Sequence, residues 1–301
     1  MTDRHSICSS DDLRISDSSH DSYRPSLART LCCLLVFGCL VPLTAQEEDP
    51  RLTAGIQDNS FFVEEAYNQE AGVVQHILNG WYSVDRMNGP DDKEFQLVFT
   101  QEWPMGSQTN QFSYTAPYSF LGTGGQQDNG VQDAMLNYRL QVFTETAQRP
   151  AFAPRLSLIL PTGDENQSFG NGTLGYQVNL PVSKIVSDRW TVHFNAGATL
   201  FPDVQDHDLV NLNLGASAIF AVSRRFNLML ECVGYFDEDV DDIGRVDRTS
   251  SVILSPGVRY AFNFKNDAQV VVGLAAPVGL TSAAPDFGVF LYFSFEHFFT
   301  R

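Results

Sequence analysis

The feature that most constrains this chain is a two-residue alternation of apolar and polar side chains that recurs along most of its length. Within 155–184, for example, Tyr176 and Val178 alternate with Gln177 and Asn179. Successive side chains of a β-strand point to opposite faces, so this period predicts strands that each have one apolar face. We predict about twelve strands and no helix, with the strands at 72–83, 95–103, 112–120, 132–142, 155–161, 174–183, 190–200, 210–220, 226–236, 251–264, 269–280 and 287–299.

The connections between these segments are of two kinds, which follow one another almost strictly in turn. An up-and-down meander with two unlike ends produces this alternation, whereas a Greek-key sandwich has no reason to. The long, acidic connections are 84–94, 122–130, 162–173, 201–209, 237–249 and 281–286, and the shorter ones are 104–109, 144–153, 184–189, 221–225 and 265–268.

The N-terminal stretch differs from the rest of the chain. Arg24 and Arg29 precede an apolar run, 31–43, which is too short to span a bilayer and is followed by an acidic stretch. This pattern predicts an export signal cleaved near Ala45. A lipoprotein modified at Cys39 and an uncleaved anchor are the alternatives.

Cysteine usage adds to this interpretation. Of the five cysteines, only Cys232 lies beyond the predicted leader, so we expect the exported chain to have no disulfide. A small secreted scaffold would need such bridges. The exported chain must therefore be held together in another way.

Alternation by itself does not say whether the apolar faces meet a protein core or lipid. Lipid is favoured by the export signal without disulfides, the even strand count, the aromatic final strand and the aromatic residues near strand ends. Because open strand edges cannot exist in hydrocarbon, the sheet must close. We predict an all-β fold, a closed antiparallel up-and-down transmembrane β-barrel of about 12 strands, with a soluble all-β exported domain as the alternative. The aromatic residues near strand ends are Trp103, Phe112, Phe120, Trp190, Phe220, Phe226 and Phe236.

Several short motifs carry a family resemblance. They are LPTGD at 160–164, GNG at 170–172, LPVSK at 180–184 and NSFFVEEAYNQEAGVVQHI at 59–77, together with the Phe-rich final strand. With these motifs the chain resembles the MetA-pathway phenol-degradation-like family of outer-membrane proteins, most strongly over roughly 155–300. The resemblance implies a Gram-negative outer-membrane barrel that could admit hydrophobic or aromatic compounds. The chain departs from the usual terminal aromatic pattern because Thr300 and Arg301 follow Phe299.

If the apolar faces look out, the polar faces line the lumen. In one interpretation the lumen is a polar pore in which Arg139 and Arg259 oppose Glu102 and Glu231 and set the charge preference. In the other, these side chains pair with each other and fill a narrow lumen. The lumen-lining candidates are Glu102, Arg139, Gln141, Gln177, Asn179, His193, Asn195, Asn213, Glu231 and Arg259, with Asn211 and Asn227 on the same faces.

Other classes of function find little support. The formal charge of −17 argues against a nucleic-acid partner. The acidic connection 237–242 lacks the regular spacing of a calcium loop, and 203–208 offers a single His, so we predict no metal. His193 and Ser217 come nearest to a catalytic pair, but no nucleophile signature accompanies them, so we predict neither an enzyme nor a cofactor.

These observations lead to one prediction of function. We expect passive passage of small molecules, hydrophobic or aromatic ones among them, through a barrel whose partners are outer-membrane lipid and the permeant. The alternative is a non-conducting surface barrel with a structural role, or a binding role through its acidic loops. The pattern carries no signal for an oligomeric state. The predicted parts are a leader with an export signal at 1–45, a periplasmic lead-in or plug at 46–71, and an outer-membrane barrel at 72–301.

Overall fold

The computed structural model describes an almost entirely β-structured chain. The described residues are 50–56, 60–86, 91–123, 125–241, 243–265 and 267–299. Short 3₁₀ turns occupy Leu52–Gly55 and Glu165–Gln167. None of the helical turns in these ranges has the length and apolar character needed to cross a membrane. The predicted leader, 1–45, and its alternatives at Cys39 lie outside the described residues.

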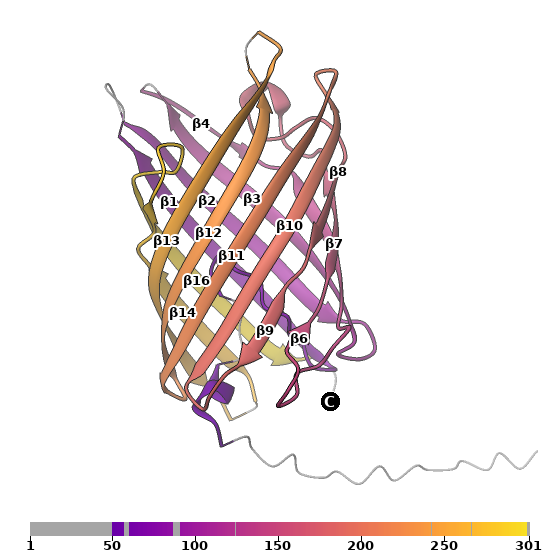
Figure 1. Cartoon of the computed structure of the whole chain (residues 1–301), viewed down its shortest axis with the longest axis vertical. Coiled ribbons are helices and arrows are strands. Elements are labelled where there is room, and N and C mark those ends of the chain that lie inside the picture. The colour runs from indigo at the N-terminus through magenta and orange to yellow at the C-terminus, as the bar shows by residue number, and fades with distance from the viewer. Residues whose placement is uncertain are drawn as a thin grey trace, which may run out of the picture. The chain divides into compact units, whose positions relative to one another are not determined.

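One sheet contains all the β segments of the described chain (Figure 1). Their bounds are β1 (Val73–Asp85), β2 (Asp92–Pro104), β3 (Asn110–Thr123), β4 (Gln126–Val131), β5 (Ala134–Leu140), β6 (Ala151–Phe152), β7 (Arg155–Leu160), β8 (Gly175–Asn179), β9 (Val182–Ile185), β10 (Trp190–Val204), β11 (His207–Ser223), β12 (Phe226–Val240), β13 (Val246–Asn263), β14 (Gln269–Ala275), β15 (Val278–Gly279) and β16 (Phe287–Phe298).

Several of these segments are two parts of one interrupted strand. Pro154 separates β6 from β7, Pro181 separates β8 from β9, and Pro277 separates β14 from β15. Proline has no N–H to donate to the ladder, so a strand is interrupted where one is placed within it. A fourth break, at 132–133, separates β4 from β5. Counted by position around the ring, the segments make 12 strands.

The ring closes between the first strand and the last. β1 pairs with β16 in antiparallel register from Val73 opposite Phe298 to Val84 opposite Phe287. Pairing continues around the sheet, and β10 joins β11 to complete the circuit. The predicted closed antiparallel barrel of about 12 strands is confirmed.

Most of the predicted long connections are shorter than expected, because the strands continue into them, whereas those at 162–173 and 281–286 keep their predicted length. β10 runs on to Val204 and β11 begins at His207, so the connection predicted at 201–209 is a hairpin with a two-residue turn. Gln205 and Asp206 in that turn have φ of 49° and 69°. Two residues with positive φ make a turn whose twist matches that of paired strands. The connection predicted at 237–249 is likewise mostly strand.

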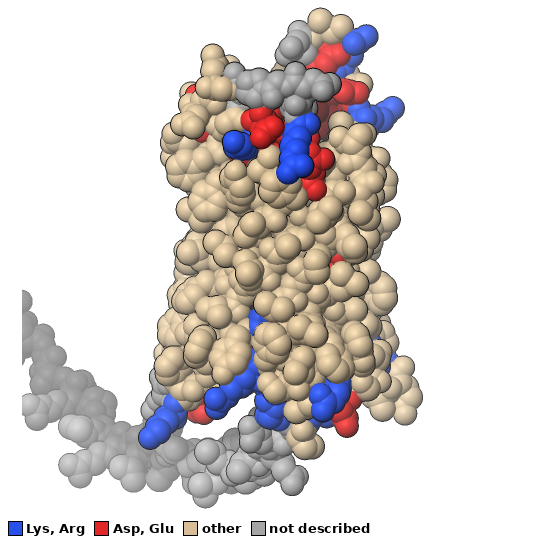
Figure 2. All heavy atoms as spheres, turned by 90° about the vertical axis from the view of Figure 1, so that its left-hand side faces the viewer, with Lys and Arg blue, Asp and Glu red and all other residues tan. Residues whose placement is uncertain are grey.

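The outer surface is apolar over its middle. Along β12, Leu230 is 50% exposed while its neighbour Glu231 is 1% exposed, and along β10, Phe194 is 55% exposed beside His193 at 1%. The polar faces therefore turn inward and the apolar faces outward. On the face drawn in Figure 2, charged residues gather at the two ends and a nearly uncharged belt lies between them. Such a belt on a closed barrel meets lipid.

Aromatic rings pair across strands near both ends of this belt. Trp190 and Phe220 have ring centroids 4.9 Å apart at the end with the short turns. Phe95 and Phe120 have centroids 6.0 Å apart near the end with the long hairpins. Aromatic rings at these levels suit the two membrane interfaces.

Candidate functional site

The lumen holds a stretch of chain that precedes the first strand. We call residues 60–69 the inner segment. At one end, Ser60 Oγ lies 2.8 Å from Ser217 Oγ on β11. At the other end, the backbone N–H of Gln69 donates to Gln111 Oε1 on β3 at 2.7 Å. Because β11 and β3 lie far apart around the ring, the inner segment crosses the lumen from wall to wall.

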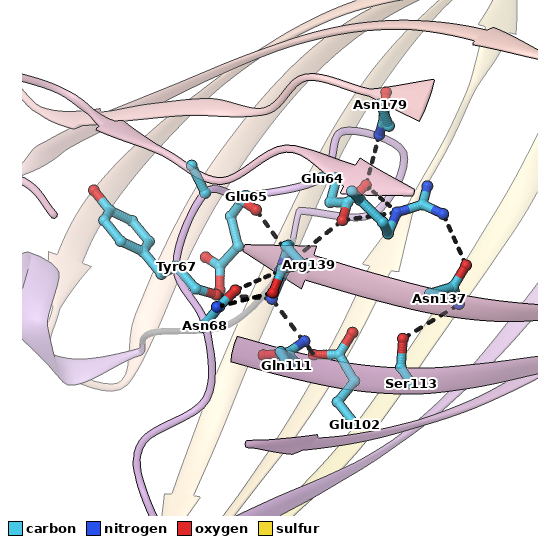
Figure 3. A network of polar contacts seen from close by, with 12 residues as sticks. Glu64, Glu65, Tyr67, Asn68, Glu102, Gln111, Ser113, Asn137, Arg139 and Asn179 are labelled. Atoms are coloured by element: carbon cyan, nitrogen blue, oxygen red, sulfur yellow. Dashed lines mark hydrogen bonds and ion pairs between the residues drawn. The ribbon is translucent and has the colours of Figure 1, made fainter. Parts of the chain in front are cut away.

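Glu64 anchors the middle of the inner segment to a polar wall (Figure 3). Its carboxylate lies 3.2 Å from Arg139 Nη1 on β5 and 2.8 Å from Arg155 Nε on β7. It also accepts from Asn179 Nδ2 on β8 at 2.5 Å. A carboxylate that is ion-paired and hydrogen-bonded inside a barrel holds its position firmly, because breaking one partner leaves the others without compensation.

Arg139 binds the inner segment at several further points (Figure 3). Its Nε donates to Asn68 Oδ1 at 2.8 Å, and Nη2 donates to the carbonyl of Tyr67 at 2.9 Å. Nη1 donates to the carbonyl of Glu65 at 3.2 Å. Glu102 lies 3.7 Å from Nη2 on the side facing β2. One buried guanidinium thus joins the barrel wall to four residues of the inner segment, including Glu64.

A second carboxylate holds the start of the inner segment. Glu231 on β12 accepts the backbone N–H groups of Phe61, Phe62 and Val63 at 3.2, 3.0 and 3.1 Å. Three converging amides give a compact site for one negative charge. The two phenylalanine rings lie against the apolar wall next to this strand.

That apolar wall is built from β1, β13, β14 and β16. The Phe61 ring is 5.3 Å from Phe290 and 5.4 Å from Tyr292, measured between centroids. The Phe62 ring packs edge-on against Trp81 at 5.1 Å. Ile77, Met229, Val271 and Ala275 complete the buried cluster. The inner segment therefore lies between a charged, hydrogen-bonding wall and an aromatic, aliphatic one.

The inner segment also separates two cavities that share no lining residue. A cavity of about 560 Å³ at the short-turn end is lined by Tyr67, Asn68, His193 and Arg259, among others. A cavity of about 200 Å³ on the long-hairpin side is lined by Phe62, Glu64, Arg155, Gln177, Asn179, Asn195, Asn213 and Tyr235, among others. Phe62 and Glu64 line one cavity and Glu65, Tyr67 and Asn68 line the other, so the inner segment lies between them.

All ten predicted lumen residues lie on the inner side of the barrel. Glu102, Arg139, Asn179, His193, Asn195, Glu231 and Arg259 are buried, and Gln141, Gln177 and Asn213 are partly buried. Their role in lining a permeation path stays a prediction. In the second interpretation of the sequence, the charged wall residues pair with each other. In the structure they also bind the inner segment: Glu231 holds it, and Arg139 divides its contacts between Glu102 and that segment.

The pair considered for catalysis has other partners. His193 Nδ1 lies 2.7 Å from Ser183 Oγ, while Ser217 Oγ bonds Ser60. His193 and Ser217 are opposite each other in the β10–β11 register, but their polar atoms serve separate contacts. Both side chains therefore brace structure in this state of the barrel.

Glu64, Asn68, Phe61 and Arg155 were not among the predicted lumen-lining residues. A signal was nonetheless present, because Arg139 and Arg155 stand at inward positions of neighbouring strands without an acidic residue across from them. Buried arginines need carboxylates, and the pair of glutamates ahead of the first strand was the available source.

Among the described residues, which include most of the acidic hairpin tips, no three His, Cys, Asp or Glu side chains are grouped so that they could bind a metal ion. Asp241 instead accepts the backbone N–H of Arg245 at 2.8 Å and pairs with its guanidinium at 2.9 Å. These bonds lower the pKa of Asp241, with the Arg245 amide contributing most. Asp242 lies outside the described residues.

Similar folds are found among solved membrane barrels. An outer membrane channel from Pseudomonas putida F1 superposes with a TM-score of 0.59 at 13% identity, covering 80% of this chain and 99% of that chain. The NanC porin (TM-score 0.43, 9% identity, 75% and 100% covered) and the transport unit of the Escherichia coli autotransporter AIDA-I (0.43, 9%, 82% and 96%) are more distant. The first supports the barrel fold alone, and the other two carry no argument about this chain.

Sequence comparison gives the family. No curated protein matches the chain. The family model described as "Putative MetA-pathway of phenol degradation" matches residues 71–296, which is most of the chain and nearly all of the barrel. The closed barrel with its lipid-facing belt belongs in the outer membrane, as the resemblance implied. The chain is therefore an outer-membrane β-barrel and a member of this family.

Proposed function

We propose that this barrel is a passive channel for small, hydrophobic or aromatic molecules and that the inner segment is its plug. The chain offers a transmembrane ring of strands, two internal cavities and a single crossing segment between them. The name of the family and the channel of similar fold from Pseudomonas putida F1 support the same class of function. The activity is non-enzymatic.

The separation of the two cavities by the inner segment is the observation that carries this proposal. The segment is attached to the wall by side chains and single amides, whereas the strands are joined by continuous ladders. A few side-chain contacts can break while the sheet stays intact, since local openings need less free energy than global unfolding. The inner segment is therefore the part of the lumen that can move while the barrel stays folded.

We propose the division of the chain that its sequence predicts. Residues 1–45 are the export leader, 46–71 are a lead-in whose last part forms the plug, and 72–301 form the barrel. β1 begins and β16 ends at the short-turn end (Figure 1), which faces the periplasm in barrels of this class. The inner segment thus enters from the periplasmic side.

The closed lumen also favours a second candidate, a barrel that does not conduct. In that case Arg139, Glu64 and Glu231 brace the interior permanently, and any function resides in the acidic hairpins. The two candidates differ in whether the inner segment ever leaves its place. A measurement of transport by the intact protein separates them.

Planar-bilayer recording of the protein purified from outer membranes is the test. A channel gives infrequent but discrete openings, and proteoliposomes swell faster in isotonic L-phenylalanine than in L-leucine, a solute of similar size. Silence in every recording, with swelling no faster than in empty liposomes, contradicts the channel. The Glu64→Gln variant serves as a positive control, because it loosens the plug without altering the sheet.

Ion preference tests the predicted lumen residues. Arg259 lines the short-turn cavity and Arg139 lies beside it, so replacing either with glutamine should lower the preference for anions over cations. The reversal potential in a KCl gradient reports this change. An unchanged reversal potential in both variants removes these arginines from the permeation path.

A further inference from the structure

The Phe61 ring lies in a recess that belongs to the barrel wall. We call this recess the ring seat and define it by Gly257 on β13, Gly273 on β14, and Phe290 and Tyr292 on β16. A Cβ at Gly257 would lie 2.7 Å from the Phe61 ring, and a Cβ at Gly273 would lie 2.5 Å from it. Both distances are shorter than carbon atoms tolerate, so the ring fits only because these two positions have no side chain.

Backbone conformation gives no reason for these two glycines. The glycines with positive φ lie elsewhere, in turns such as those at Gly106, Gly125 and Gly244. Gly257 and Gly273 lie inside strands, where glycine weakens the sheet and usually marks a close approach by another group. Glycine at these positions on two adjacent strands lowers the stability of the strands and leaves room for a flat ring.

The seat is complete without the inner segment. Its floor is made by the two glycines and its sides by Phe290 and Tyr292, which are 4% and 3% exposed. Phe61 itself is held by a hydrogen bond from its backbone N–H to Glu231, which can break and re-form. When the inner segment leaves, a ring-sized apolar recess with aromatic sides opens to the lumen.

We propose that the ring seat is a binding site for a small, neutral, six-membered aromatic solute, and that this solute competes with Phe61 for it. Aromatic sides favour an aromatic ring over a saturated one of equal size. The apolar lining of the seat disfavours an aromatic ion, because burying a charge without a partner is costly. The inference rests on the proposed passage of small molecules, because it names the class of solute that the plug admits.

Competition couples binding to opening. Phe62 lines the long-hairpin cavity, so a solute in that cavity meets the inner segment beside the seat. A solute that occupies the seat excludes the Phe61 ring and thereby disfavours return of the inner segment. The solute binds the open state better than the closed state. This difference in affinity shifts the equilibrium toward the open state.

Fluorine NMR with 4-fluorophenol measures this binding directly. The protein is placed in dioleoylphosphatidylcholine nanodiscs, and empty nanodiscs account for partition into lipid. The Phe61→Ala variant should bind 4-fluorophenol at least about tenfold more tightly than the unchanged protein, because the competitor is gone. In Phe61→Ala/Gly273→Val the seat is filled and the gain should disappear. 4-Fluorocyclohexanol should bind more weakly throughout.

Phe62→Ala is the matched control, since the Phe62 ring packs on Trp81 and Phe290 and is not among the groups nearest to the two glycines. An equal gain from Phe62→Ala, or a gain that survives the filled seat, overturns the proposal. So does equal binding of 4-fluorophenol by Phe61→Ala and the unchanged protein.

A reversible lock provides a test that leaves the seat itself unaltered. The Ser60 and Ser217 hydroxyls are 2.8 Å apart, so Ser60→Cys/Ser217→Cys in a Cys232→Ser background should form a disulfide that keeps the inner segment in place. The oxidised protein should not bind 4-fluorophenol, and reduction should restore binding. Equal binding in both forms overturns the competition.

Failure of this inference and failure of the proposed function are distinguishable. If 4-fluorophenol binds to the seat of a protein that never conducts, the channel function is wrong and the binding site stands. Conductance and phenylalanine entry without saturable 4-fluorophenol binding remove the site and leave the channel.

Discussion

The two walls of the lumen hold the inner segment in different ways. On the β5–β8 side, Arg139, Arg155 and Asn179 converge on Glu64 with directed, charge-assisted hydrogen bonds. On the β13–β16 side, the Phe61 ring rests in a recess left by glycines, with contacts that depend on shape. Hydrogen bonds to charged groups are lost sharply when geometry changes, whereas apolar contact tolerates exchange of one ring for another.

This difference assigns the two walls different tasks. The polar wall determines where the inner segment sits, because only its own carboxylate and carbonyls match Arg139. The apolar wall can accept a substitute for the segment, because a recess of the right shape does not distinguish a side chain from a free solute. The comparison is testable by weakening each wall separately.

Breaking the polar wall should have the largest effect. Glu64→Gln leaves Arg139 and Arg155 without their shared carboxylate, and loss of one partner of a buried pair costs about 3 kcal/mol. The inner segment should then leave its place about 100-fold more often. Hydrogen exchange of the Ala66 amide, which donates to Ser183, reports this directly. Glu238→Gln, in an exposed pair with Arg248, is the control and should change nothing inside.

Loosening the amide contact on β12 should have a smaller effect. Glu231→Gln keeps one acceptor oxygen for the N–H groups of Phe61, Phe62 and Val63 but removes the charge and the second oxygen. We expect a loss of about 2 kcal/mol, seen as faster exchange of these three amides, with Ala66 affected less. If Ala66 exchange accelerates equally, the two walls release the segment together and the comparison fails.

Filling the ring seat should cost less again. In Gly273→Ala the added methyl group meets the Phe61 ring, and the ring can shift. We therefore expect the free energy with which the ring binds its seat to weaken by about 1 kcal/mol. Exchange of the Phe61 amide should rise several-fold. Gly234→Ala is the matched control on β12, two strands away, since the nearest atoms to its Cβ are 3.8 Å away. Equal effects from both variants would mean that the seat does not position the ring.

Acidification should loosen a hairpin tip that lies outside both walls, the smallest of these effects. The pKa of Asp241 is lowered in the folded protein by the Arg245 amide, so its contribution is present above the ordinary value of 3.8 and is lost as pH falls through the lowered pKa. Faster exchange of the Arg245 amide below about pH 4 checks this. No such change is expected in Asp241→Asn, which lacks the titrating group.

The strands were predictable because their signal is local. Alternation in β10, β11 and β12 identified both the strand and the inward face, so His193, Asn195 and Glu231 were placed on the inner side from sequence. The connection predicted at 201–209 contains the turn at Gln205 and Asp206 but was too long, because Asp and Pro residues are typical of loops although the paired strands here continue through them. The breaks at Pro181 and Pro277 were visible as residues but not as interruptions of a strand.

The sequence by itself determined the strands and the apolar face of each, and with the export signal and the aromatic residues near strand ends it favoured a closed barrel whose apolar faces meet lipid. Only the tertiary structure decided what fills the lumen. Phe61 and Glu231 are separated by 170 positions, and Glu64 and Arg139 by 75. No local pattern records such pairings. They arise because a closed ring brings inward positions of distant strands around one segment, where each buried charge requires a partner.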